Sequence, residues 1–279
     1  MPPQQPHPSN PNPPSLPPSQ ASHLLTSFTQ FLTVCIHNIL YYRAIYPAPT
    51  FLTSRAYNLP VHQSRHPKVC AWVRDAVDAV QAQLAAGAVE RLAVVLYDAQ
   101  ARVLERWMFD VAGFPAWNGF FREAKGPRRR EEDEEDQGQA GGGSGGGGRS
   151  DGGAGSGTAS GNANDKVNWT NVDEQLRAAV RRLAFAGEKM APLPDGCTFT
   201  IAVELRGEGE APIGHPQPWI PTQPSLQTNS KDGRPPGEDV GGARTTPLRA
   251  VEAGPLFFEC WVEEGKAKEE LASSVSSSR

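Results

Sequence analysis

One segment near the start of the 279-residue chain constrains the fold more than any other. Its apolar residues recur three and four positions apart, which predicts an amphipathic helix with one buried face. These residues are Phe28, Phe31, Leu32, Cys35, Ile36, Ile39 and Leu40. We expect the helix to begin near Ser22 and to end near Ile45, because the proline at Pro47 cannot continue it.

A polar loop broken by proline follows this helix. It carries Tyr57, Asn58, Leu59 and Pro60. A second helix then begins with Pro67 at its first turn, where proline is favoured. We expect this helix to end near Gly87, with Trp72 at the margin of its apolar face. A buried helix followed by a rigid, tyrosine-bearing loop is more typical of a binding module than of an active site.

The remaining ordered segments predict strands and one more helix. Residues 91–98 are typical of a strand buried on both faces, and residues 103–111 complete an antiparallel hairpin. A third helix is expected from Trp169, where Thr170 and Asp173 resemble a capping box. Residues 197–205 alternate as a strand should, with Phe199 on the apolar face. Residues 256–264 are predicted to form the last strand.

Proline and glycine separate these segments. The chain contains 28 Gly and 26 Pro. Residues 1–21 are proline-rich and predicted to be disordered, and residues 125–166 combine an acidic run with a glycine-rich tract, which predicts a flexible insertion. The stretch after Arg206 is irregular up to the last strand, and we expect residues 265–279 to fray. What remains within residues 22–264 is about the size of one ordinary domain.

Composition excludes several classes of function. The formal net charge is -4, with acidic and basic residues mixed, whereas a nucleic-acid-binding face is usually a cluster of basic residues. The four cysteines lack paired spacing, which argues against a disulfide framework. No secretory signal is recognisable, and no apolar run approaches the ~20 residues that span a bilayer. We expect a soluble protein of the nucleus or cytosol.

Two sets of residues invite a chemical interpretation. His62, His66 and Cys70 are spaced four apart, as metal ligands on a helix can be. A cysteine nucleophile could pair Cys35 with His37, or Cys197 with a distant histidine. We favour the interpretation that the histidines lie in surface loops and that the cysteines are packing residues. His62 is expected in a loop, no fourth ligand stands nearby, and Cys35 lies on the buried stripe. The sequence therefore predicts no metal, no cofactor and no catalytic residue.

Three tryptophans are better candidates for function. Trp72 lies at the edge of its helix, Trp219 in an irregular loop bounded by proline, and Trp261 on the last strand, apart from the face of Phe258 and Cys260. Aromatic side chains dominate the energetics of protein interfaces. We expect at least one of the three to contact a peptide or a protein.

The motifs AYNLPVHQSRHP, PDGCTFTIAVE and ECWVEE, in this order along the chain, strongly resemble the HORMA-domain accessory subunits of translesion DNA polymerase zeta. The resemblance covers roughly residues 24–120 and 167–264. It implies an α+β fold in which three helices pack on one face of a mostly antiparallel sheet. It also implies that residues 206–264 form a safety belt, a mobile region that closes over an extended peptide of a partner.

The same resemblance implies binding residues. Trp72 and Trp219 would enclose a proline ring of a peptide from the polymerase's catalytic subunit. Tyr57, Pro60 and Ile220 are further candidates for this peptide. A second surface would bind the translesion scaffold that bears the deoxycytidyl transferase. Its residues would be Thr245, Leu248, Glu259 and Trp261.

The resemblance also implies further partners. Arg177 on the third helix would lie where HORMA domains pair with a second protomer, and a HORMA-remodelling ATPase is another expected partner. The predicted function is a non-catalytic adaptor that supports replication past DNA lesions in the nucleus. A spindle-checkpoint or meiotic adaptor, an enzyme that uses Cys197 or Cys35, and direct DNA binding are the alternatives.

Overall fold

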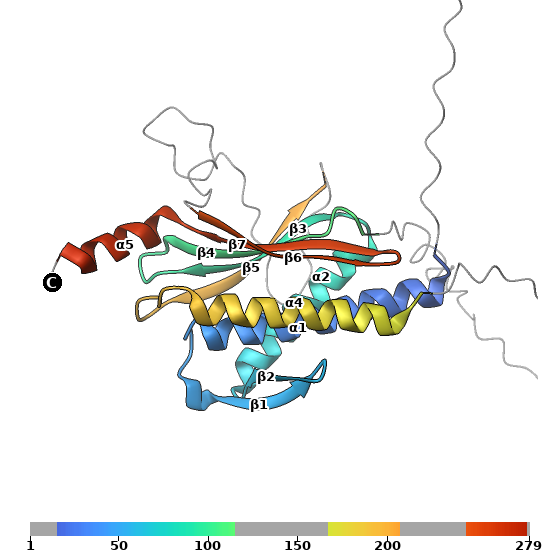
Figure 1. Cartoon of the computed structure of the whole chain (residues 1–279), viewed down its shortest axis with the longest axis horizontal. Helices are drawn as coiled ribbons and strands as arrows, with labels where there is room; N and C mark the ends of the chain where they lie inside the picture. Colours follow the sequence, from blue (N-terminus) through green and yellow to red (C-terminus); the bar gives the residue numbers. More distant parts are fainter. Residues whose placement is uncertain (1–15, 115–166, 207–243, 278–279) are drawn as a thin grey trace, which may run out of the picture.

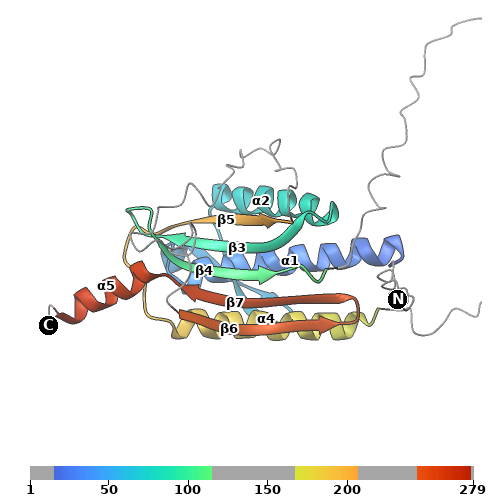
Figure 2. The same cartoon turned by 90° about the horizontal axis from the view of Figure 1, so that it is seen from above.

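Three helices lie side by side against one face of an antiparallel sheet (Figure 1). The computed structural model describes residues 16–114, 167–206 and 244–277. Helix α1 (Pro18–Tyr42) is central, and it contacts both α2 (Pro67–Ala85) and α4 (Trp169–Lys189). Figure 2 shows α2 beside one edge of the sheet and α4 along the other. This arrangement agrees with the predicted α+β fold.

The sheet has five strands in the order β5-β3-β4-β7-β6. Their bounds are β3 (Val89–Tyr97), β4 (Val103–Asp110), β5 (Thr198–Leu205), β6 (Arg244–Ala253) and β7 (Leu256–Glu264). Each pairs with its neighbours in antiparallel register. Strands β5 and β6 are therefore the two edges, although no other described element lies between them in the sequence.

A two-stranded hairpin forms a third layer on the other side of α1 (Figure 1). It consists of β1 (Phe51–Ala56) and β2 (Leu59–Ser64), preceded by a short 3-10 helix, η1 (Ala48–Thr50). Tyr57 and Asn58 join the strands with φ of 51° and 55°, the positive values that two-residue hairpin turns require. The expectation of a loop without strands here is wrong, because the segments on either side of this turn pair as β1 and β2.

The apolar stripe of α1 forms the centre of the core, as predicted. Phe28, Phe31, Cys35, Ile36 and Ile39 are each completely buried. By length and composition α1 could span a membrane, but 67% of the relevant window is buried inside the fold. Packing against the sheet and the neighbouring helices accounts for its apolar character.

Several predicted boundaries need correction. Helix α1 starts at Pro18, four residues before Ser22, so residues 18–21 are helical and were wrongly predicted to be disordered. Helix α4 is capped by Asn168, whose Oδ1 accepts a hydrogen bond from the Asn171 amide at 3.1 Å, and not by Thr170. Strand β6 occupies residues that were expected to be irregular.

The C-terminal segment also differs from the expectation. Helix α5 (Lys266–Ser277) forms where the sequence predicts fraying. It extends beyond the end of the sheet (Figures 1 and 2), and its Lys268 is only 6% exposed.

Candidate functional site

Strand β5 is one of the two edges of the sheet that the described residues form. Within the described part of the chain it pairs with β3 alone, from Val89↔Leu205 to Tyr97↔Thr198. The backbone N–H and C=O groups on its other side have no strand partner among these residues. An edge of this kind can accept an extended peptide as one more strand.

Three half-buried aromatic rings lie beside this edge. Phe199 on β5 meets Trp72 of α2 edge to face, with ring centroids 4.9 Å apart. Tyr46 meets the same phenyl ring at 6.4 Å and a similar angle. We call Tyr46, Trp72 and Phe199 the aromatic group. Its rings are partly exposed, so they offer an apolar surface to a side chain of a strand added to β5.

Local sequence explains why these rings meet. Phe199 is the first apolar residue of the alternating strand, three residues after the turn at Asp195 and Gly196. Phe199, Ile201 and Val203 pack against the helical core, whereas Ala202 belongs to a cluster on the other face of the sheet. Trp72 stands at the margin of the buried face of α2, as the sequence predicted. Phe199 was predicted only as part of an apolar face, and Tyr46 was not considered.

Tyr57 lies in a different place from Trp72. It lines a hollow of about 610 Å³ between α1 and α4, together with Val34 and Arg177. The side chain is half-buried, and burial is the main cause that raises its pKa. Pro60 is exposed on β2, opposite Arg55. The structure therefore separates these two candidates from Trp72, and their role in peptide binding stays a prediction.

Two other peptide-binding candidates, Trp219 and Ile220, lie outside the described residues, as does most of the expected safety belt. The described part of that region is the β6–β7 hairpin. In the five-stranded sheet β7 lies between β6 and β4 and pairs with both.

The four residues expected to bind a scaffold all lie on the β6–β7 hairpin but do not share one surface. Glu259 and Trp261 alternate with buried residues on β7 and face away from the helices. Thr245 is exposed and pairs with Glu263, on the same face. Leu248 lies at an irregularity in the register and is only 7% exposed, packed in the helical core. It therefore does not join the surface that the other three residues form.

Arg177 is partly exposed on α4 and lies 3.3 Å from the carboxylate of Glu174, one turn earlier on the same helix. Such surface pairs contribute little to stability. The predicted role of Arg177 in pairing two protomers stays a prediction.

Residues 25–240 match the family model of the HORMA domain. The chain belongs to the HORMA domain family. It is 26% identical over 239 residues to the DNA polymerase zeta processivity subunit of Schizosaccharomyces pombe, covering 85% of this chain and 91% of that protein. It is 35% identical over 235 residues to the mitotic spindle assembly checkpoint protein MAD2B of Homo sapiens, covering 84% and 88%.

Solved structures agree on the fold of this HORMA domain. A chain of the mitotic checkpoint complex superposes with a TM-score of 0.55 at 17% identity, covering 87% of this chain and 98% of that chain. HTP-2 bound to HTP-3 motif-6 gives a TM-score of 0.51 at 13% identity, covering 90% and 94%. At these identities the likeness shows the fold alone, and it confirms the predicted HORMA arrangement.

Two cysteines of this HORMA domain, Cys35 and Cys197, lie in surroundings that disfavour the thiolate form. Burial raises the pKa of Cys35 well above its usual value, and it also raises that of Cys197. The Cys197 thiol donates to the Pro194 carbonyl at 3.1 Å. A nucleophilic cysteine needs the opposite shift, toward the thiolate. In the described ranges no three His, Cys, Asp or Glu residues are placed to hold a metal, and the His62 ring stacks on Tyr41 with centroids 3.4 Å apart.

Proposed function

We propose that this protein is a non-catalytic adaptor subunit of DNA polymerase zeta. In this proposal it binds an extended, proline-containing peptide of the catalytic subunit as an added strand along β5. The observation that supports this most is the open β5 edge with the aromatic group beside it. Two relatives, from Schizosaccharomyces pombe and Arabidopsis thaliana, are named processivity subunits of this polymerase.

Both parts of the site have a task in peptide binding. An added strand gains main-chain hydrogen bonds to β5, which give affinity for any extended segment. The aromatic group would favour proline-containing peptides over other extended segments, because a proline ring packs well on an aromatic face and loses little conformational entropy on binding. Trp219 and Ile220 would complete the enclosure of that ring from the other side.

The connection between the two edges of the sheet is consistent with a safety belt. The chain leaves β5 at Leu205 and returns in β6 at Arg244, on the opposite edge. The segment 207–243 thus starts beside the proposed peptide and ends at the far side of the sheet. A segment fixed at both ends that covers the peptide would slow its dissociation.

The outer surface of the β6–β7 hairpin is the proposed contact with the translesion scaffold. Trp261 is partly exposed there and packs against a small apolar cluster of Ala93, Val95 and Met108. A partly exposed tryptophan whose ring packs against buried side chains is typical of an interface hot spot. Strands β3 and β4 separate this proposed scaffold contact on β7 from the proposed peptide site on β5. The scaffold and the peptide could therefore bind at the same time. We also propose that the adaptor acts in the nucleus.

Binding of a fluorescent peptide tests the main proposal. A synthetic peptide of the catalytic subunit that contains spaced prolines is titrated with the full chain, and anisotropy gives the Kd. Trp72→Ala should weaken binding by roughly tenfold or more, the equivalent of about 1.4 kcal/mol. Trp72→Tyr should retain most of the affinity, because the ring remains. Trp261→Ala on the distant hairpin is the matched control and should bind as the unmodified chain does.

Two results would overturn this function. One is unchanged affinity in Trp72→Ala with the fold intact by thermal unfolding. The other is preference for a different peptide. Because a relative is named a mitotic spindle assembly checkpoint protein, checkpoint-derived and meiotic peptides belong in the same titration. Tighter binding of those peptides would favour the alternative of a spindle-checkpoint or meiotic adaptor.

A further inference from the structure

The face of the sheet that points away from the helices carries an apolar row across all five strands. The three packed helices α1, α2 and α4 lie on the opposite face (Figure 1). An antiparallel sheet that faces water on one side normally carries polar residues there. In the strand order β5-β3-β4-β7-β6, the register partners of this row are Ala202, Ala93, Met108, Trp261 and Pro247. The row is therefore a candidate contact surface.

Two aromatic rings pack against the centre of this row. Ala93, Val95 and Met108 form a small cluster there, and each is only 3–6% exposed. Tyr97 of β3 and Trp261 of β7 both pack against this cluster, and both remain partly exposed. Tyrosine and tryptophan rings that are supported by buried side chains are the residues most enriched in interface hot spots. The cluster thus presents two possible anchors for a partner.

Polar contacts on β4 and β7 connect the two rings. Arg106 Nη2 lies 2.5 Å from Glu263 Oε2, and Trp261 Nε1 donates to Glu263 Oε1 at 2.8 Å. Burial raises the pKa of Tyr97, and the nearby positive charge of Arg106 partly offsets this rise. Arg106 therefore lies between the tyrosine and the tryptophan. We name Tyr97, Arg106, Trp261 and Glu263 the sheet surface.

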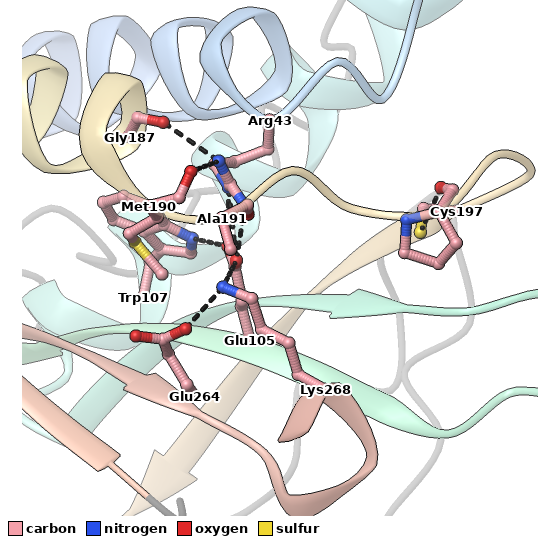
Figure 3. Close-up of polar contacts among 10 residues, drawn as sticks. Arg43, Glu105, Trp107, Gly187, Met190, Ala191, Cys197, Glu264 and Lys268 are labelled. Atoms are coloured by element: carbon pink, nitrogen blue, oxygen red, sulfur yellow. Dashed lines mark hydrogen bonds and ion pairs between the residues drawn. The ribbon is translucent and has the colours of Figure 1, made fainter. Parts of the chain in front are cut away.

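A buried ion cluster fixes the two strands that carry most of this surface. Glu105 of β4 is 0% exposed and is the register partner of Glu264 on β7. Lys268 of α5 bridges them, with its Nζ 2.5 Å from Glu105 Oε1 and 2.6 Å from Glu264 Oε2 (Figure 3). Arg106 and Glu263 are the neighbours of these two carboxylates in the sequence, so the bridge also holds the sheet surface in register. A surface that is rigid before binding loses less conformational entropy on association.

The next row on the same face of the sheet is acidic. It contains Glu204, Arg91, Asp110 and Glu259, on β5, β3, β4 and β7. Arg91 is the one cation of this row, and it pairs with Asp110 at 3.1 Å and with Glu204 at 3.0 Å. Glu259 is exposed, and no described residue forms an ion pair with it. The row therefore keeps an excess of negative charge beside Trp261, which favours a partner with basic side chains.

We propose that the translesion scaffold binds across β7, β4 and β3, with Trp261 and Tyr97 as its two anchors and its basic side chains beside Glu259. The inference rests on the proposed scaffold contact and extends it from the β6–β7 hairpin to β3. The matching face of the scaffold carries apolar side chains next to lysine or arginine, because the sheet surface lies beside an acidic row. The aromatic group of the peptide site packs on the helix-facing side at β5, so peptide and scaffold do not compete.

Calorimetric titration of the full chain with the isolated scaffold domain tests the second anchor and the charge of the partner. Tyr97→Ala should weaken binding roughly tenfold, about 1.4 kcal/mol, whereas Tyr97→Phe should retain most of the affinity because the ring remains. Glu259→Lys should weaken binding by a similar factor, because it brings like charges together. Glu188→Lys makes the same change of charge at an exposed position of α4 and is the matched control. Urea unfolding checks that each variant is folded.

The outcomes separate this inference from the proposed function. Added salt should weaken scaffold binding to the unmodified chain more than to Glu259→Lys. Unchanged affinity in folded Tyr97→Ala, with binding lost in Trp261→Ala, would confine the contact to the hairpin and overturn the inference alone. Equal effects of Glu259→Lys and Glu188→Lys, whether losses or none, would overturn the basic partner. If the unmodified chain binds no scaffold domain, the proposed scaffold contact fails, and its extension to β3 fails with it.

Discussion

The indole of Trp72 meets the phenyl ring of Phe199 edge to face, with the ring centroids 4.9 Å apart. This contact connects the second helix to the open edge strand. The position of Trp72 therefore depends on a residue of the strand that would receive the peptide. Rings that meet in this way gain about 0.5–1.5 kcal/mol beyond the area they bury, so each ring restricts the other.

Phe199→Ala should therefore weaken peptide binding although the peptide's main-chain partners on β5 remain. We expect a loss of affinity of roughly tenfold and, because the ring is only half-buried, a fall in the free energy of unfolding of about 2–3 kcal/mol, at or below the lower end for phenylalanine. Anisotropy titration and urea unfolding measure the two effects. Thr200→Ala, the next residue on the opposite face, is the control. Equal affinity in both variants would contradict the assigned role of Phe199.

Trp261→Ala should abolish binding of the translesion scaffold and leave peptide binding intact. The indole is partly exposed, and its Nε1 donates to Glu263 at 2.8 Å on the same strand, so removal should alter the surface more than the fold. Calorimetric titration with the isolated scaffold domain checks this outcome. Leu248→Ala should behave differently, because that side chain is 7% exposed in the core and its truncation should cost about 2–4 kcal/mol of stability. Loss of scaffold binding in Leu248→Ala without loss of stability would contradict the assignment of Leu248 to the core and not to the scaffold-binding surface.

His37 should make stability depend on pH. The residue is 4% exposed, and burial lowers its pKa below the usual 6.5. As pH falls through about 6.5, the unfolded chain binds a proton before the folded chain does, so the free energy of unfolding decreases. At pH 7.5 both states are neutral at this residue, and the contribution is constant.

Urea unfolding at pH 7.5 and 5.0 measures this effect. His37→Leu should lose less stability between the two values than the unmodified chain does. His62→Gln serves for comparison, since burial lowers the pKa of His62 as well and the sign is the same. An unchanged pH dependence in His37→Leu would show that the imidazole binds its proton equally well in the folded and the unfolded chain, which would contradict the lowered pKa.

Local patterns predicted the elements that carry their own signal. The stripe of α1 and the apolar run of β3 are long and regular, and both were placed within a few residues of their bounds. Strand β6 was missed because Pro247 and Arg249 interrupt its alternation at an irregularity in the register, and edge strands tolerate such residues. The β1–β2 turn uses Tyr57 and Asn58 in place of the asparagine–glycine pair that signals most hairpins.

Contacts between distant residues could not be read from the sequence. Helix α5 was missed because its anchor, Lys268, meets a carboxylate 163 positions earlier, and no local pattern encodes that distance. The resemblance to known HORMA proteins grouped Tyr57 with Trp72, whereas the turn directs Tyr57 to the hollow beside Arg177. Phe199 and Tyr46 are apolar or aromatic residues of the kind that usually pack in a core. Only the fold shows that they lie beside the edge strand β5.

Two adjacent phenylalanines on β7 provide a direct test of which face of the sheet is the core. Phe258 is fully buried and meets Phe28 and Phe31 with ring centroids 5.2 Å and 5.3 Å apart. Phe257 is 40% exposed on the other face, where it lies over Gly113. Phe258→Ala should therefore reduce the free energy of unfolding by about 3–5 kcal/mol, and Phe257→Ala by less than about 1 kcal/mol.

Urea unfolding of the two variants measures this difference directly. Both lose the same atoms from the same strand, so strand propensity cancels and the contrast reports burial alone. Similar losses in the two variants would mean that a further part of the chain covers the outer face of the sheet. In that case Phe257 would belong to a second core, and the proposed scaffold contact at Trp261 would have to lie elsewhere, because the same cover would reach the neighbouring positions of β7.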